Sequence, residues 1–254
     1  MDDLYNQAFR NMDETLRMLE ARVPPPQKVP HLDSFVFRYL EKTIHQAMIQ
    51  KLARVVSGLH AARLLLENGL LQEQAAVQRM LDEFHEDILF LAYAVILNDH
   101  TPLHQKYLDA FYQEEFDAPS ALESTQKRQM VSREKIRAYV ARAELAGADP
   151  STGVELSRTI NKGYSGYVHG AYPHVMDMFG GNPPQFHVHG MQGTERQEEH
   201  RYDLWNYFFR SIISFAFAAK AFGDEEHFRR FRDYHLEFDK QSGRNNAFRA
   251  PNES

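Results

Sequence analysis

Residues Gln72–Leu97 read QEQAAVQRMLDEFHEDILFLAYAVIL, and apolar side chains recur in this segment at intervals of three and four. The recurring apolar positions are Val77, Met80, Leu81, Phe84, Ile88, Leu91, Ala92 and Val95. This spacing places them along one stripe of an α-helix, because a helix has 3.6 residues per turn. We therefore predict a long helix with a buried apolar stripe. We expect Glu83, Glu86 and Asp87 on its solvent-exposed side.

The same periodicity continues on both sides of this segment and is interrupted by turn residues. It predicts further helices over Asp2–Arg22, Leu103–Phe116, Val131–Gly147, Glu155–Tyr172 and Glu195–Phe222. Two more helices are predicted to begin at capping residues. One starts at Asp33 or Ser34, ends near Asn68 and places Phe35 and Tyr39 in the core; the other starts at Asp224 and ends near Lys240.

These elements predict an all-α fold, a bundle of about seven or eight helices in one domain that spans residues 1–254. Residues 1–30 supply the first helix and a connector with three consecutive prolines, Pro24–Pro26. A Gly- and Pro-rich loop lies near residues 180–193, where Gln185–His189 is the only candidate strand. Residues 241–254 are expected to form a frayed tail.

Composition and charge exclude several classes of protein. The chain has no cysteine, which removes disulfides, thiolate metal sites and cysteine nucleophiles. Its formal net charge of −6 disfavours generic nucleic-acid binding, because phosphate neutralisation dominates such affinity. The longest apolar run, Phe90–Leu97, is too short to span a bilayer, and the acidic amino terminus does not resemble a secretion signal. We expect a cytoplasmic protein without a membrane partner.

Basic residues also gather on the helix predicted over Val131–Gly147. They are Arg133, Lys135, Arg137 and Arg142. We interpret them as a solvated helix face, which is the usual role of a run of charges on a helix.

The candidate functional residues lie in SRTINKGYSGYVHG, residues 157–170, and in the four residues that follow it. At about 100° per residue, one face of the predicted helix carries two cations, a hydroxyl, an imidazole and a phenol. These residues are Arg158, Lys162, Ser165, His169 and Tyr172. The adjoining candidate binding residues are Asn161, Tyr164, Tyr172 and His174. The glycines of this segment provide either close helix packing or room for a ligand.

The string GYSGYVHG, residues 163–170, resembles the signature "Tyr, small, Ser, two residues, Val-His" of some divergent HEPN-type helical domains of bacteria. The segment Arg79–Asp117 also resembles parts of bacterial helical proteins, so the resemblance covers about half of the chain. It implies a helical domain that dimerises and, in active members, cleaves RNA without a metal by means of an arginine and a histidine. His169 matches the histidine. Lys162, not an arginine, stands at one position permitted to the cation, and lysine lacks the planar bidentate fork.

We therefore expect RNA or nucleotide engagement, with metal-independent cleavage as the candidate chemistry. His169, Lys162, Ser165 and Arg158 are the candidate catalytic residues, no cofactor is required, and a homodimer is the expected assembly. One alternative is a non-catalytic helical interaction module. Another is a metal-dependent hydrolase in which His187 and His189, two apart on an extended segment, join His169 or His174 around zinc.

Overall fold

The computed structural model describes residues 1–31, 33–114, 118, 120, 122–124, 128–144 and 165–243. In this part of the chain most residues are helical and two small sheets have two strands each, which confirms the predicted all-α bundle. The elements are α1 (Asp2–Glu20), β1 (Gln27–His31), β2 (Ser34–Arg38), α2 (Ile44–Glu67), α3 (Leu71–Ile96), α4 (Pro102–Phe111), α5 (Arg133–Glu144), α7 (Tyr172–Met176), β3 (Phe179–Gly180), β4 (Gln185–Phe186), α8 (Glu195–Ala221) and α9 (Glu225–Ser242). The predicted tail lies outside the described residues from position 244 onward.

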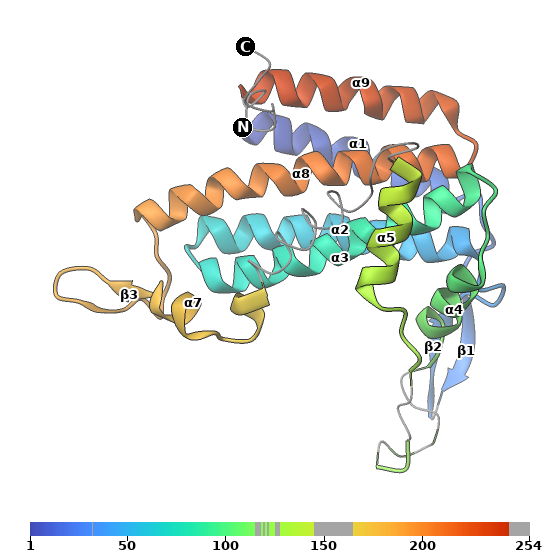
Figure 1. Cartoon of the computed structure of the whole chain (residues 1–254), viewed down its shortest axis with the longest axis horizontal. Coiled ribbons are helices and arrows are strands. Elements are labelled where there is room, and N and C mark those ends of the chain that lie inside the picture. The colour runs from blue at the N-terminus through green and yellow to red at the C-terminus, as the bar shows by residue number, and fades with distance from the viewer. Residues whose placement is uncertain are drawn as a thin grey trace.

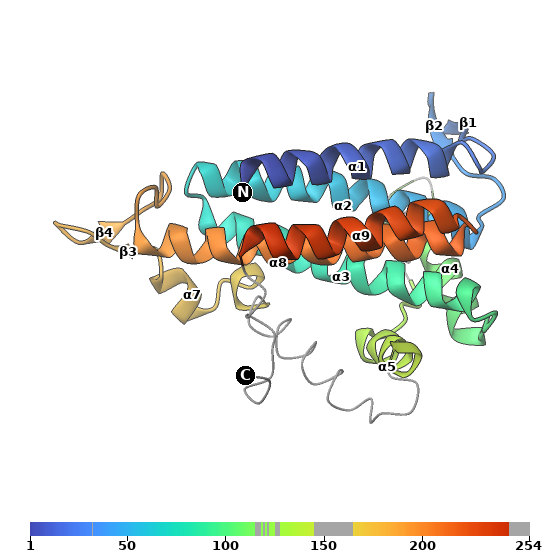
Figure 2. The same ribbon diagram turned by 90° about the horizontal axis from the view of Figure 1, so that it is seen from above.

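Five long helices, α1, α2, α3, α8 and α9, lie alongside one another and form the bundle (Figures 1 and 2). The apolar residues of α8 that face the bundle are buried, and they include Leu204, Trp205, Phe208, Ile212, Phe215 and Ala219. The shorter α5 crosses these helices steeply (Figure 1) and covers a second apolar cluster around Phe90, Ile136 and Tyr139. Among the described helices, none has both the length and the apolar composition that crossing a bilayer requires.

Side-chain caps fix where several of these helices begin. The Thr43 hydroxyl accepts a hydrogen bond from the Gln46 backbone N–H at 3.2 Å, and the Gln46 side chain accepts one from the Thr43 N–H at 3.0 Å. This reciprocal pair is a capping box, which satisfies N–H groups that would otherwise have no partner. The Asp224 carboxylate accepts from the His227 N–H at 3.0 Å, so its predicted role as the cap of the last helix is confirmed.

The largest correction concerns the helix predicted to start at Asp33 or Ser34. Residues 27–31 and 34–38 instead pair as an antiparallel hairpin in which Val29 lies opposite Val36, and the helix begins only at Ile44. Alternating aromatic and β-branched residues favour a strand, and Phe35–Phe37 has this pattern. Phe35, predicted in the core, is exposed, whereas Tyr39 is buried as predicted.

The Gly- and Pro-rich loop contains the short β3–β4 hairpin, which projects beyond the end of the bundle (Figure 1). Its return to the bundle is fixed at the turn between α2 and α3, where the Met191 N–H donates to the Gly69 carbonyl at 2.8 Å. Gly69 has a φ of +69°, and a Cβ there would lie 2.6 Å from the Met191 nitrogen. The side-chain amides of Gln192 and Gln197 donate to the Glu67 and Leu66 carbonyls at 2.9 and 2.7 Å. The last carbonyl groups of α2 therefore accept hydrogen bonds from side chains at and just before the start of α8.

Candidate functional site

The structure places half of the predicted site residues. Arg158, Asn161, Lys162 and Tyr164 lie outside the described residues. Ser165 and His169 are described, and the His169 backbone N–H donates to the Ser165 carbonyl at 3.2 Å, so the two residues lie one helical turn apart. His169 is exposed and Ser165 is half-buried.

The predicted continuous helix over Glu155–Tyr172 is wrong at its carboxyl end. Residues 165–168 are helical, a turn follows, and Gly170 adopts a φ of +60° that favours glycine. Ala171 is extended and caps a separate short helix, α7, which begins at Tyr172. Because the helix ends before Tyr172, this residue does not continue the face formed by Ser165 and His169.

His174 packs inward against the helical turn of residues 165–168. Its ring lies 4.4 Å from the Tyr167 ring in an edge-to-face arrangement, and a Cβ on Gly166 would lie 2.1 Å from the His174 Cε1 atom. The Gln72 side-chain amide donates to the His174 carbonyl at 2.7 Å. Gly166 therefore allows close packing, which is one of the two roles considered for the glycines of this segment.

Tyr167 connects this segment to the start of α8. Burial raises the pKa of its phenol, and the nearby Asp177 carboxylate adds to that effect. Asp177 forms an ion pair with Arg196 at 2.8 Å. The Tyr167 ring also contacts the His200 ring edge-on at 5.9 Å, so the predicted segment meets a buried imidazole of α8.

His200 begins a row of polar side chains between α3 and α8, most of them buried, which we name the polar seam. The seam consists of Gln74, Gln78, Asp82 and His85 on α3 and of His200, Tyr207, Arg210 and Ser214 on α8. His200 Nδ1 lies 2.9 Å from the Gln74 side-chain oxygen, and burial lowers the pKa of His200. Gln78 is fully buried, and among the described residues neither of its amide atoms has a hydrogen-bond partner.

The middle of the polar seam contains an ion pair and a hydroxyl–imidazole pair. Asp82 is fully buried and pairs with Arg210. Burial raises the pKa of Asp82, while the Arg210 charge acts in the opposite direction. His85 Nδ1 lies 2.6 Å from the Ser214 hydroxyl oxygen, and burial lowers the pKa of His85 well below its ordinary value. Ser214 and Asp82 are fully buried, and both pairs join α3 to α8.

A second buried charge cluster corrects the prediction for the acidic residues of α3. Glu86 and Asp87, expected on a solvent-exposed side, are buried. Asp87 pairs with Arg133 at 2.6 Å and with Lys51 at 2.8 Å, and Glu86 pairs with Arg137 at 2.8 Å. Arg133 and Arg137 were interpreted as part of a solvated face. They instead form ion pairs that hold α5 against α3.

Exposed apolar side chains gather on the segment that leaves the bundle, and we name them the projecting surface. They are Val168, Tyr172, Val175, Phe179, Phe186 and Val188. Tyr172 is 78% exposed and Val188 63%, and Phe179 packs edge-on against Phe186 across the β3–β4 hairpin at 5.0 Å. Several large apolar side chains exposed on one segment indicate an interaction site.

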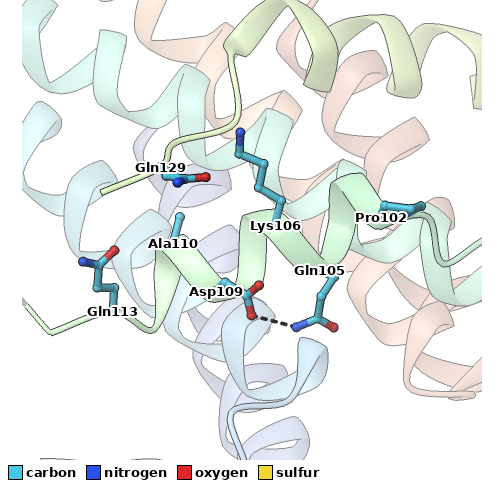
Figure 3. A pocket seen from close by; sticks show the side chains of 7 residues that line it. All are labelled: Pro102, Gln105, Lys106, Asp109, Ala110, Gln113 and Gln129. Atoms are coloured by element: carbon cyan, nitrogen blue, oxygen red, sulfur yellow. Dashed lines mark hydrogen bonds between the residues drawn. The ribbon is translucent and has the colours of Figure 1, made fainter. Parts of the chain in front are cut away.

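Two of the shallow hollows on the described surface lie on different elements. One, of about 450 Å³, lies between the β3–β4 hairpin and the start of α8, where Asp177, Arg196 and Glu199 are already paired with one another. The other, of about 520 Å³, lies on α4. Figure 3 shows Gln105 bonded to Asp109 along that helix, with Gln129 approaching Ala110 from a separate segment.

The histidines considered as zinc ligands do not lie on one extended strand. β4 ends at Phe186, and the following residues form a turn in which the Gly190 N–H donates to the His187 carbonyl at 3.2 Å. Within the described ranges no three His, Asp or Glu side chains are grouped so that they could hold a metal ion. No observation therefore favours the metal-dependent hydrolase.

Polar residues of the seam were not recognised in the sequence because they lie among the apolar positions of two amphipathic helices. The spacing of Gln74, Gln78 and Asp82, four apart, is the one signal that could have found them.

A comparison of the chain with protein-family models finds no match, and searches of curated proteins and of solved structures also find none.

Proposed function

We propose that this chain is a helical interaction module that forms a homodimer through the projecting surface. The observation that carries the proposal is the exposure of six apolar side chains on one segment at the end of the bundle. Burying them against a second copy is favourable, at about 25 cal/mol per Å² of apolar surface removed from water.

Charge favours a second copy as the partner. Asp177 is the only charged residue between positions 165 and 191, and Arg196 neutralises it. The whole chain has a net charge of −6, so two copies carry the same net charge and repel one another. Contact through an uncharged segment avoids that repulsion.

The segment that carries the projecting surface is also held in place before any partner binds. His174 packs on Gly166, the Met191 N–H is bonded to the α2–α3 turn, and Asp177 is paired with α8. A fixed surface loses less conformational entropy on association than a loop that must first become ordered.

The direct test is the mass of the protein in solution, measured by light scattering after size exclusion. We expect the native chain to show about twice its monomer mass of 29.6 kDa, and Tyr172→Asp/Val188→Asp to be monomeric. The matched control is Leu64→Asp/Leu236→Asp, which alters two exposed apolar residues on α2 and α9. A monomeric native chain, or identical behaviour of the two double variants, contradicts the proposal.

The second candidate function is RNA or nucleotide engagement with metal-independent cleavage, and one observation favours it. The His169 imidazole is exposed, and Ser165 lies one helical turn before it. An accessible imidazole can move a proton to or from a phosphodiester without a metal. In this proposal Arg158 and Lys162 supply the charge that steadies the phosphate, and Asn161 and Tyr164 contribute to binding.

This second candidate is tested by incubating total RNA with the protein in EDTA. We expect cleavage by the native chain, loss of cleavage in His169→Ala, and full activity in His189→Ala, which removes another exposed imidazole nearby. Intact RNA with the native chain, together with no binding in a filter assay, ends the ribonuclease proposal and leaves the homodimer proposal unaffected.

A further inference from the structure

His200 lies at the junction between the bundle and the segment that carries the projecting surface. It belongs to α8 and is only 5% exposed. Its Nδ1 atom lies 2.9 Å from the Gln74 side-chain oxygen, and the Gln74 amide donates to the His200 carbonyl at 3.4 Å. Its ring also contacts the Tyr167 ring edge-on at 5.9 Å. An amide and a phenol are both uncharged at neutral pH, so neither offers a counter-charge to a protonated imidazole.

The charges around His200 do not outweigh its burial. Asp203, Glu199 and Arg196 lie near it on α8, and Asp177 approaches from the segment after α7. Arg196 is already paired with Asp177 and Glu199, at 2.8 and 2.7 Å. Burial is the largest influence on the pKa of His200 and lowers it, whereas the Asp203 carboxylate acts in the opposite direction with less effect. A protonated ring therefore favours an arrangement in which water reaches it.

The two neighbours of the His200 ring are held with different strength. Gln74 belongs to α3, a helix of 26 residues that packs along α8 through the polar seam and the apolar core. Tyr167 belongs to a single helical turn, residues 165–168, which is followed by Gly170 with a φ of +60°. Local opening of a folded protein begins where few contacts hold the backbone. The short segment with Tyr167 is therefore the part that moves when water enters beside His200.

We propose that protonation of His200 releases residues 165–178 from the start of α8 and thereby separates the two copies of the homodimer. The inference rests on the homodimer proposed above and adds its regulation by acid. Val168, Tyr172 and Val175 of the projecting surface belong to this segment. Once released, the segment must become ordered again before a second copy can bind, and that ordering weakens association.

Exposed imidazoles near the projecting surface are the alternative source of an acid effect. His169 and His189 are exposed, so their protonation in the single chain does not require the segment to move. In a homodimer, charged imidazoles of the two copies repel one another if they face each other across the interface. Variants of both kinds are therefore needed to assign an acid response to His200.

The first experiment measures the mass in solution by light scattering from about pH 7.5 to about pH 4.5, at constant ionic strength and protein concentration. We expect the native chain to change from dimer to monomer as pH falls, with the dissociation constant rising at most about tenfold per pH unit for each copy. His200→Gln takes up no proton at this position, so we expect it to stay dimeric. The matched control, His169→Gln/His189→Gln, should dissociate as the native chain does.

A second experiment follows the segment itself, without the dimer. Hydrogen exchange of Tyr172→Asp/Val188→Asp, the variant expected to be monomeric, is measured by mass spectrometry over the same pH range and corrected for the intrinsic pH dependence of exchange. The backbone N–H groups of Val175 and Asp177 are hydrogen-bonded within the segment. We expect protection of residues 165–178 to fall with pH while protection of α3 is retained.

The outcomes separate this inference from the homodimer on which it rests. A native chain that stays dimeric at every pH, an equal acid response in His200→Gln, or unchanged protection of residues 165–178 overturns the inference and leaves the homodimer unaffected. A native chain that is already monomeric at about pH 7.5 overturns both. If His200→Gln does not fold, as checked by circular dichroism, the exchange experiment alone decides.

Discussion

Residues 82–87 of α3 and residues 168–188 beyond the bundle reverse the usual distribution of side chains. The first segment, DEFHED, buries three carboxylates, and the second exposes six apolar side chains. Each carboxylate is buried because a cation from another helix reaches it, as Arg210 reaches Asp82 and Arg133 reaches Asp87. The projecting apolar residues lie on a segment that leaves the bundle (Figure 1). Comparison of the two segments shows that the partner available in the fold, more than the residue type, decides where a side chain lies.

The largest expected effect comes from removing one buried carboxylate. Asp87→Ala leaves Lys51 and Arg133 without the group that both now contact. Breaking a buried ion pair on one side costs about 3–5 kcal/mol, because an uncompensated charge remains inside. We expect the free energy of unfolding, measured by urea denaturation, to fall by that amount.

The control for this prediction is Asp13→Ala, which removes an exposed carboxylate paired with Arg17 at 3.6 Å. An exposed ion pair contributes about 0–1 kcal/mol. A similar effect of both substitutions would show that the buried cluster contributes no more than a surface pair, and the comparison above would not hold.

The next effect tests how the projecting segment is held. Gly166→Ala places a Cβ where the His174 ring now lies, and overpacking of this kind costs about 1–3 kcal/mol. We expect the amide hydrogens of residues 165–178 to exchange faster, as followed by mass spectrometry. Gly166→Ala/His174→Ala should restore much of the protection, and failure of this rescue would argue against direct packing between the two residues.

A smaller effect is the loss of folding stability that acid causes through His200 of the polar seam. Burial lowers the folded-state pKa of His200, so below the unfolded pKa of about 6.5 the unfolded chain takes up a proton that the folded chain does not. Stability should therefore fall by up to about 1.4 kcal/mol per pH unit for this residue as pH drops from 6.5 toward the lowered pKa, with no change above 6.5. Melting temperatures at pH 7 and pH 5 measure the difference, which should shrink in His200→Gln and stay the same in His189→Gln.

The smallest expected effect lies on the projecting surface itself. Val188→Ser changes a side chain that is exposed in the single chain, so we expect the free energy of unfolding of the monomer to change by less than about 0.5 kcal/mol. Urea denaturation at low protein concentration measures this quantity. A loss of more than about 1 kcal/mol would mean that Val188 is packed within the monomer, which would remove it from the proposed interface.

The long helices could be predicted from the sequence because their periodicity extends over many turns. α3 and α8 each span seven turns or more, and Asp224 marks the start of α9 as a capping residue should. The hairpin at residues 27–38 could not be predicted in the same way. Ser34 resembles a helix cap, and Phe35 and Tyr39 have helical spacing, so a five-residue strand and the first turn of a helix share one pattern.

The candidate site could be predicted only in part, for a different reason. The spacing of Ser165 and His169 correctly places them one turn apart, because this relation depends on local winding alone. The burial of Glu86 and Asp87 depends on α5 crossing α3, and the position of Tyr172 depends on a glycine with positive φ. Such relations come from contacts between distant segments or from a single backbone angle, which local periodicity does not encode.

The bonds that tie Met191, Gln192 and Gln197 to the end of α2 have a consequence for protein engineering. They fix the point at which the chain returns from the projecting hairpin to the bundle, through residues that lie outside the hairpin itself. The residues between Met178 and Gly190 can therefore be exchanged for another loop as a cassette. An insertion at Gly69 would instead redirect whatever loop the scaffold displays.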